Sequence, residues 1–174
     1  MKYDPLKHHR RSIRLKGYDY RLAGAYFVTL VTWKKECLFG EIVNGEMHLN
    51  RFGHLVEDEW QRMGNRIGWV VVEEMVVMPN HLHGILVIVD NGTITRQDAT
   101  RKKPGGVAGS LGAVVGVYKS TTTRMINTIR NSRGASVWQR NFYEHIIRDE
   151  GQWDAVRAYI QTNPLNWEQD REYH

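Results

Sequence analysis

The sequence predicts an α+β domain with a mainly antiparallel sheet, and three features support this prediction. Segments rich in β-branched and aromatic residues alternate with segments whose apolar residues recur at helical spacing. Asn44-Gly45 stands between two short strand-like segments, and this dipeptide is the strongest short-range signal of a β-hairpin. The chain of 174 residues is long enough for one core without disulfide or metal staples.

The predicted strands are β-branched or aromatic segments: 25–33, two short strands within 37–49, 69–77 and 82–89. Asn50 can cap a helix over 51–63, and a second helix is expected over 111–129. Residues 137–147 are expected to be irregular to extended. A last helix is expected to start near Asp149, a suitable N-cap, and to end before Pro164.

Composition excludes several classes of protein. The single cysteine, Cys37, cannot form an internal disulfide, and residues 1–21 lack the apolar core of a signal peptide. The longest apolar stretch, 85–89, is too short to span a membrane. We therefore expect a soluble cytoplasmic protein, with a basic arm (1–22), one main domain (23–165) that contains a mobile loop (90–109), and a C-terminal tail (166–174).

The net charge of +5 is concentrated in two segments. Residues 2–21 hold seven Lys or Arg against two acids, and residues 99–143 hold eight with no acid. Such clustering favours a surface that binds a polyanion, although a solvated basic surface would produce the same pattern. The candidate DNA contacts are Arg10, Arg11, Arg14, Lys102, Lys103, Lys119, Arg124 and Arg140.

His81-Leu82-His83 stands at the start of a predicted strand. Side chains alternate along a strand, so both imidazoles point to one face and can chelate one divalent cation. On the last predicted helix, Tyr159 and Asn163 lie at i and i+4, hence on the same side. Each pair alone is also compatible with ordinary packing.

Four segments taken together resemble a known family. VVMPNHLHGILVI (76–88) resembles the HUH motif, in which a bulky apolar residue separates two histidines, of insertion-sequence transposases with a single catalytic tyrosine. VWQRNFYEHIIRDE (137–150) and YIQTNP (159–164) resemble the C-terminal signature of REP-associated tyrosine transposases. GAYFVTLVTW (24–33) also resembles their first strand, so the resemblance covers most of the chain in the same order.

The resemblance implies a role for each matching residue. His81 and His83 would bind a divalent ion, expected to be Mg²⁺ or Mn²⁺, and Asn163 would complete the metal site. Tyr159 would attack single-stranded DNA that contains a hairpin, form a 5′-phosphotyrosine link and allow strands to be rejoined. Tyr118 and Tyr143 lack the neighbours that match the family pattern.

The resemblance also implies the architecture and the partners. The expected fold is a ferredoxin-like or RRM-like sandwich, with the helices on one face of the sheet and an extra β-hairpin. A homodimer acting on DNA of the bacterial nucleoid is expected, with no organic cofactor and no membrane partner.

Three other functions remain compatible with the sequence. The first is a domesticated relative that binds hairpin DNA or RNA without cleaving it. The second is a single-strand or RNA-binding module that needs no metal. The third is a metal-dependent hydrolase of small substrates, which would leave the clustered basic charge unexplained. A covalent protein–DNA adduct would separate the transposase from all three.

Overall fold

The computed structural model describes residues 19–89, 102–103, 106–107 and 109–173. Its helices and strands follow one another as β1 (Gly24–Val31), η1 (Trp33–Lys35), β2 (Gly40–Val43), β3 (Glu46–Leu49), α1 (Arg51–Arg66), β4 (Val70–Met78), β5 (His81–Ile88), β6 (Lys102–Lys103), β7 (Gly106–Val107), α2 (Leu111–Ile129), β8 (Tyr143–Ile147), α3 (Glu150–Thr162) and η3 (Pro164–Gln169).

Four strands form the central sheet in the order β4-β5-β1-β8, and every neighbouring pair is antiparallel. With α1 after β1 and α2 after β5, the chain follows the β-α-β-β-α-β order of ferredoxin-like folds. The hairpin β2-β3 forms a separate two-stranded sheet. The predicted α+β class, mainly antiparallel sheet and extra hairpin are therefore confirmed.

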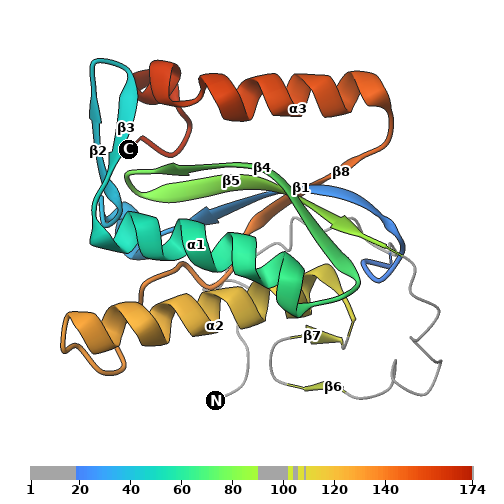
Figure 1. Ribbon diagram of the computed structural model, residues 1–174, viewed down its shortest axis with the longest axis horizontal. Helices are drawn as coiled ribbons and strands as arrows, with labels where there is room; N and C mark the ends of the chain where they lie inside the picture. Colours follow the sequence, from blue (N-terminus) through green and yellow to red (C-terminus); the bar gives the residue numbers. More distant parts are fainter. Residues whose placement is uncertain (1–18, 90–101, 104–105, 108, 174) are drawn as a thin grey trace, which may run out of the picture.

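Two helices cover one face of the sheet. Figure 1 shows α1 and α2 side by side below the strands. Their contact with the sheet is a large apolar core that includes Tyr26 and Leu30 of β1, Leu82 of β5, Trp60 of α1 and Tyr118 of α2. Burial of this apolar area is the main force that holds the helices on the sheet.

The third helix lies on the opposite face, which corrects the expectation that all helices share one face (Figure 1). A second apolar cluster contains Phe27, Ile85 and Ile147 of the sheet and Ile160 of α3. The central strands carry apolar side chains on both faces, so both faces need a cover. The apolar side of α3 supplies the second one.

The boundaries of most elements agree with the sequence prediction. Asn50 caps α1, as expected, because its Oδ1 accepts hydrogen bonds from the backbone N–H groups of Phe52 (2.8 Å) and Gly53 (3.1 Å). Asp149 caps α3 through the N–H of Gln152 (2.8 Å). The histidine strand starts at His81 itself, one residue before the predicted start.

Two predicted features lie largely outside the described residues. These are most of the basic arm (1–22) and most of the loop at 90–109, of which β6 and β7 are described. No helix within the described part of the chain is long and apolar enough to cross a membrane.

Gly84 allows α1 to approach the middle of β5 closely. A Cβ atom at this position would lie 2.5 Å from Cζ2 of Trp60, a contact that real side chains do not make. Trp60 is fully buried and has little room to move. Glycine is therefore required where the indole ring crosses the strand.

We expect Gly84→Ala to lower the free energy of unfolding by about 1–3 kcal/mol, because overpacking forces the indole or the strand to shift. Urea denaturation followed by tryptophan fluorescence measures this change. Gly68→Ala is the control, since nothing lies within 4 Å of its added Cβ. Equal stability of the two variants would contradict the role given to Gly84.

Candidate active site

His81 and His83 form the floor of the candidate site. They face the α3 side of the sheet, where His83 stacks on Phe27 with ring centroids 5.3 Å apart. Their side chains are 0% and 3% exposed, and their Nε2 atoms are 3.0 Å apart. The strand alternation thus brings both imidazoles together, as the sequence predicted.

The outer nitrogen of each imidazole is held by a neighbouring side chain. Asn80 Oδ1 lies 2.7 Å from His81 Nδ1, and Thr29 Oγ1 lies 2.8 Å from His83 Nδ1. An amide oxygen only accepts, so Nδ1 of His81 carries the hydrogen and Nε2 keeps its lone pair. Such support of the outer nitrogen is typical of histidines that bind metals.

Burial keeps His81 neutral. Loss of solvation, with a smaller effect of the neighbouring His83 charge, lowers the pKa of His81 to about 3. At neutral pH the imidazole is therefore in the deprotonated form that a metal ligand requires.

The tyrosine and the asparagine reach this floor from α3. Tyr159 Oη lies 3.3 Å from His83 Nε2, within a single chain. Its ring meets Phe27 edge-on at 6.0 Å, and the side chain remains 42% exposed, so that a substrate can approach it. Asn163 caps the C-terminal end of α3 and is 1% exposed.

The other two tyrosines considered from the sequence are placed differently. Tyr118 is buried in the α2 core, where its hydroxyl donates to the carbonyl of Val56 (2.7 Å). Tyr143 of β8 is 43% exposed and packs edge-on against Phe27, on the same face as Tyr159.

Asp170 is a central residue of the site that the sequence analysis did not identify. It lies in the stretch 166–174, which was predicted as a tail. Its Oδ2 accepts hydrogen bonds from Tyr159 Oη (3.0 Å) and Asn163 Nδ2 (2.8 Å). Its carboxylate oxygens lie 3.9 Å from His81 Nε2 and 3.7 Å from His83 Nε2.

The chain after Pro164 turns back onto the sheet and carries Asp170 to the histidines. Lys35 forms an ion pair with Glu172 (3.3 Å), and Asn80 Nδ2 donates to the carbonyl of Glu172 (2.7 Å). No spacing rule links Asp170 to Tyr159, because a helix end and η3 separate them. The only indication in the sequence was that an acidic residue follows shortly after the helix that carries Tyr159.

The donor atoms suit a divalent cation. His81, His83 and Asp170 each offer a ligand atom, and these atoms lie within 4.8 Å of one another. Asn163 Oδ1 is buried and has no hydrogen-bond partner within the described structure, which leaves an amide oxygen unsatisfied beside this group. Two imidazole nitrogens with carboxylate and amide oxygens form a set that divalent ions accept.

The acid and the phenol have oppositely shifted pKa values. Burial alone would raise the pKa of Asp170, but the interaction with the nearby His83 and the hydrogen bond from Asn163 outweigh it and hold that pKa below its usual range. Burial first, and then the charge of Asp170, raise the pKa of Tyr159. The resting site therefore contains a carboxylate that accepts a hydrogen bond from a neutral phenol.

The predicted DNA contacts do not lie among these residues. Lys119, Arg124 and Arg140 line a separate pocket beside α2. Lys102 and Lys103 form β6, and their side chains lie outside the described structure, as do Arg10, Arg11 and Arg14.

Comparison with known proteins gives one relative by sequence. The chain is 43% identical over 177 residues to an uncharacterized protein of Haemophilus influenzae, across 99% of this chain and 97% of that protein. The two belong to one family. No model of a known protein family matches the chain.

Two solved structures are similar in shape. A REP-associated tyrosine transposase bound to a REP hairpin has a TM-score of 0.54 and 15% identity, over 90% of this chain and 74% of that one. A candidate transposase from Deinococcus radiodurans has a TM-score of 0.46 and 14% identity, over 86% and 96%. At 15% identity the first similarity establishes a shared fold.

The buried His81 makes stability depend on pH. Its folded pKa of about 3 lies below the ordinary value of 6.5, so between these values the unfolded chain binds the extra proton. The free energy of unfolding should therefore fall as pH decreases below about 6.5, by up to about 1.4 kcal/mol per pH unit.

Urea denaturation in chelator at several pH values between 7 and 4.5 measures this slope. We expect His81→Asn to flatten it, whereas His54→Asn, which removes an exposed histidine of α1, should leave it unchanged. An unchanged slope in His81→Asn would refute the neutral, buried state of His81.

Proposed function

We propose that the protein is a metal-dependent DNA strand transferase of the HUH single-tyrosine type, with Tyr159 as the nucleophile. The observation that carries this proposal is the 3.3 Å separation of Tyr159 Oη from His83 Nε2 within one chain. Helix α3 and strand β5 lie far apart in sequence, yet each delivers a side chain of the predicted type to one spot. The shared fold with a transposase bound to a REP hairpin supports the choice of DNA as substrate.

In the proposed reaction, Tyr159 Oη attacks a phosphorus atom of single-stranded DNA. A Tyr–O–P bond to the 5′ side forms, and the bond to the 3′ oxygen breaks. The phenolic proton leaves along the existing hydrogen bond to Asp170 Oδ2, 3.0 Å away, and passes on to solvent water, while the departing 3′ oxygen takes up a proton from water to become a hydroxyl. The number of phosphoester bonds is conserved, so a 3′-hydroxyl of a second strand can reverse the step and join DNA.

The metal would be held by His81, His83, Asp170 and Asn163, and Mg²⁺ or Mn²⁺ suits their mixture of nitrogen and oxygen. When bound, a divalent cation supplies positive charge that stabilises the phosphoryl group under attack. Asp170 is the one anionic side chain of this set. Its negative charge would therefore act on both the metal ion and the hydroxyl of Tyr159, with which it shares a hydrogen bond.

Tyr159→Phe should abolish the covalent adduct, because it removes the attacking oxygen while keeping the ring. The substrates are single-stranded oligonucleotides with an imperfect hairpin, taken from the DNA on either side of the protein's own gene and incubated with Mg²⁺ or Mn²⁺. A 3′ label should migrate with the protein on a denaturing gel, whereas a 5′ label should appear on a shortened free strand.

Tyr143→Phe is the matched control, since Tyr143 has nearly the same exposure (43% against 42%) and contacts the same Phe27. It should retain the adduct. An adduct that persists in Tyr159→Phe would refute the assignment of the nucleophile. DNA binding by the wild type without any adduct would instead favour the domesticated, non-cleaving alternative.

Asp170→Asn should weaken Mn²⁺ binding about tenfold or more, because it removes the anionic ligand while keeping the shape of the side chain. Titration followed by electron paramagnetic resonance measures this without any catalytic readout. Asp154→Asn, an exposed carboxylate of α3, is the control. Equal Mn²⁺ affinity of the two variants would remove Asp170 from the proposed metal site.

A further inference from the structure

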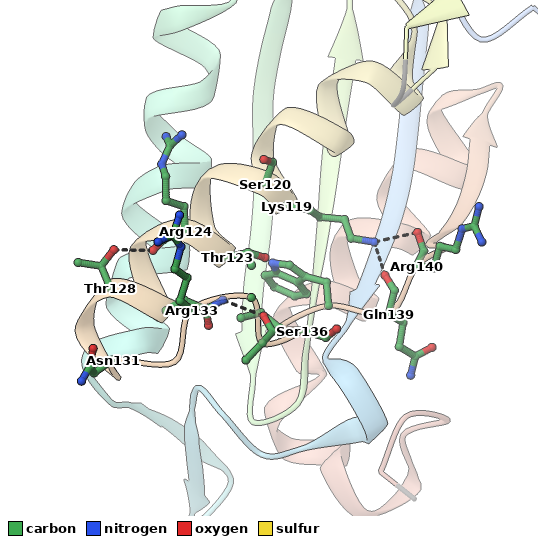
Figure 2. Close-up of a pocket in the computed structure, with 15 residues that line it drawn as sticks. Lys119, Ser120, Thr123, Arg124, Thr128, Asn131, Arg133, Ser136, Gln139 and Arg140 are labelled. Atoms are coloured by element: carbon green, nitrogen blue, oxygen red, sulfur yellow. Dashed lines mark hydrogen bonds between the residues drawn. The ribbon is translucent and has the colours of Figure 1, made fainter.

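A pocket of about 760 Å³ lies between the C-terminal half of α2 and the segment that follows this helix. Its wall is built from α2 on one side and residues 131–140 on the other (Figure 2). Trp138 contributes to its apolar part, and the indole is fixed there by a hydrogen bond from Nε1 to Thr122 Oγ1 (2.9 Å). Hydroxyl and amide side chains also line it: Ser120, Thr123, Asn127, Thr128, Asn131 and Ser136.

The charge of this pocket has one sign. Its lining contains Lys119, Arg124, Arg133 and Arg140 and no acid. The three arginines are exposed, and within the described residues none of them forms an ion pair with a carboxylate. Three guanidinium groups without carboxylate partners favour an anion, and their planar donor geometry suits phosphate.

Within the described residues, the side chain of Lys119, unlike those of the three arginines, is hydrogen-bonded to the protein backbone. Its Nζ donates to the carbonyl oxygens of Gln139, Arg140 (3.3 Å) and Asn141 (3.2 Å), two of which Figure 2 shows as dashed lines. The ammonium group uses its N–H donors on these backbone carbonyls and so holds residues 139–141, at the end of one wall of the pocket, against α2. Lys119 is therefore a positioning residue, and the guanidinium groups of the three arginines are the ones available to bind a ligand.

The pocket wall continues into the candidate active site. Residues 137–139 pair with the end of β1 and the start of η1: Trp33 N–H donates to the carbonyl of Val137 (2.8 Å), and Gln139 N–H donates to the carbonyl of Val31 (2.8 Å). Val31 is in turn paired with His81.

The chain then leads from the pocket to the nucleophile. Arg140 stands three residues before Tyr143, which lies across Thr29 from His83. At about 3.3 Å per residue, this stretch spans roughly 10 Å, a length that a few nucleotides can follow.

We propose that this pocket binds the sugar–phosphate backbone of the DNA that flanks the cleavage site, with Arg124, Arg133 and Arg140 contacting phosphates. The identity of the ligand as DNA rests on the proposed function, but the binding does not require Tyr159 or a metal. The strand would pass from the pocket around the β8 edge, along Arg140 and Tyr143, to Tyr159.

The test compares two triple variants with the same loss of charge. The first is Arg124→Gln/Arg133→Gln/Arg140→Gln, and the control is Arg51→Gln/Arg62→Gln/Arg148→Gln, whose exposed side chains lie outside the pocket. Both are made in the Tyr159→Phe background. Binding of a fluorescent hairpin oligonucleotide with single-stranded flanks is measured by anisotropy in EDTA over a salt series.

At physiological salt, we expect the pocket variant to bind at least about thirtyfold more weakly, and the control less than about threefold. The plot of log K against log salt has a negative slope, and its steepness should be reduced by about 2–3 in the pocket variant. This reduction corresponds to the loss of one phosphate contact per arginine. Thymidine monophosphate at millimolar concentration should not displace the oligonucleotide, because a single phosphate meets one arginine.

Three results would overturn the proposal: equal weakening in both variants, no binding by the parent protein, or full displacement by the mononucleotide. Circular dichroism and the urea midpoint of each variant verify the fold. Since the assay excludes metal and nucleophile, a loss of affinity without any adduct in the cleavage assay would retain this pocket and reject the strand-transfer function.

Discussion

The alternation of side chains along β5 is the constraint on which the rest of the structure depends. Leu82, Gly84 and Leu86 face α1 and α2, whereas His81 and His83 face α3. One strand therefore builds the main core with one face and the candidate site with the other. Its central position, between β1 and β4, removes both histidines from solvent and places polar groups of β1 and of the preceding turn beside them.

Burying two imidazoles requires that their polar atoms find partners, and the fold supplies these from separate segments. Thr29 and Asn80 hold the outer nitrogens, and Asp170 lies near the inner ones. The inner side of the cluster also holds the unsatisfied amide oxygen of Asn163. This combination of imidazole nitrogens, a carboxylate and an unpaired oxygen is more suitable for a bound cation than for a structural hydrogen-bond network.

Local patterns predicted much of this architecture, since strand alternation, the Asn44-Gly45 turn and the caps at Asn50 and Asp149 act over a few residues. They also put His81 beside His83 and Tyr159 beside Asn163, but only the resemblance to single-tyrosine transposases joined the two pairs, and the roles of these residues stay predictions. Asp170 was missed because its position depends on how the chain turns after α3. The position of α3 was missed because periodicity shows that a helix has an apolar side, but not which face of a sheet that side covers.

The most direct test of the central claim is to locate the bond between protein and DNA by mass spectrometry. After cleavage of the hairpin oligonucleotide, nuclease trimming and trypsin digestion, the nucleotide should be attached to the peptide 158–171, in which Tyr159 is the one tyrosine. Attachment through its phenolic oxygen to a 5′-phosphate is the predicted result. A nucleotide on the peptide 141–148, which contains Tyr143, or on any peptide without Tyr159, would contradict the account.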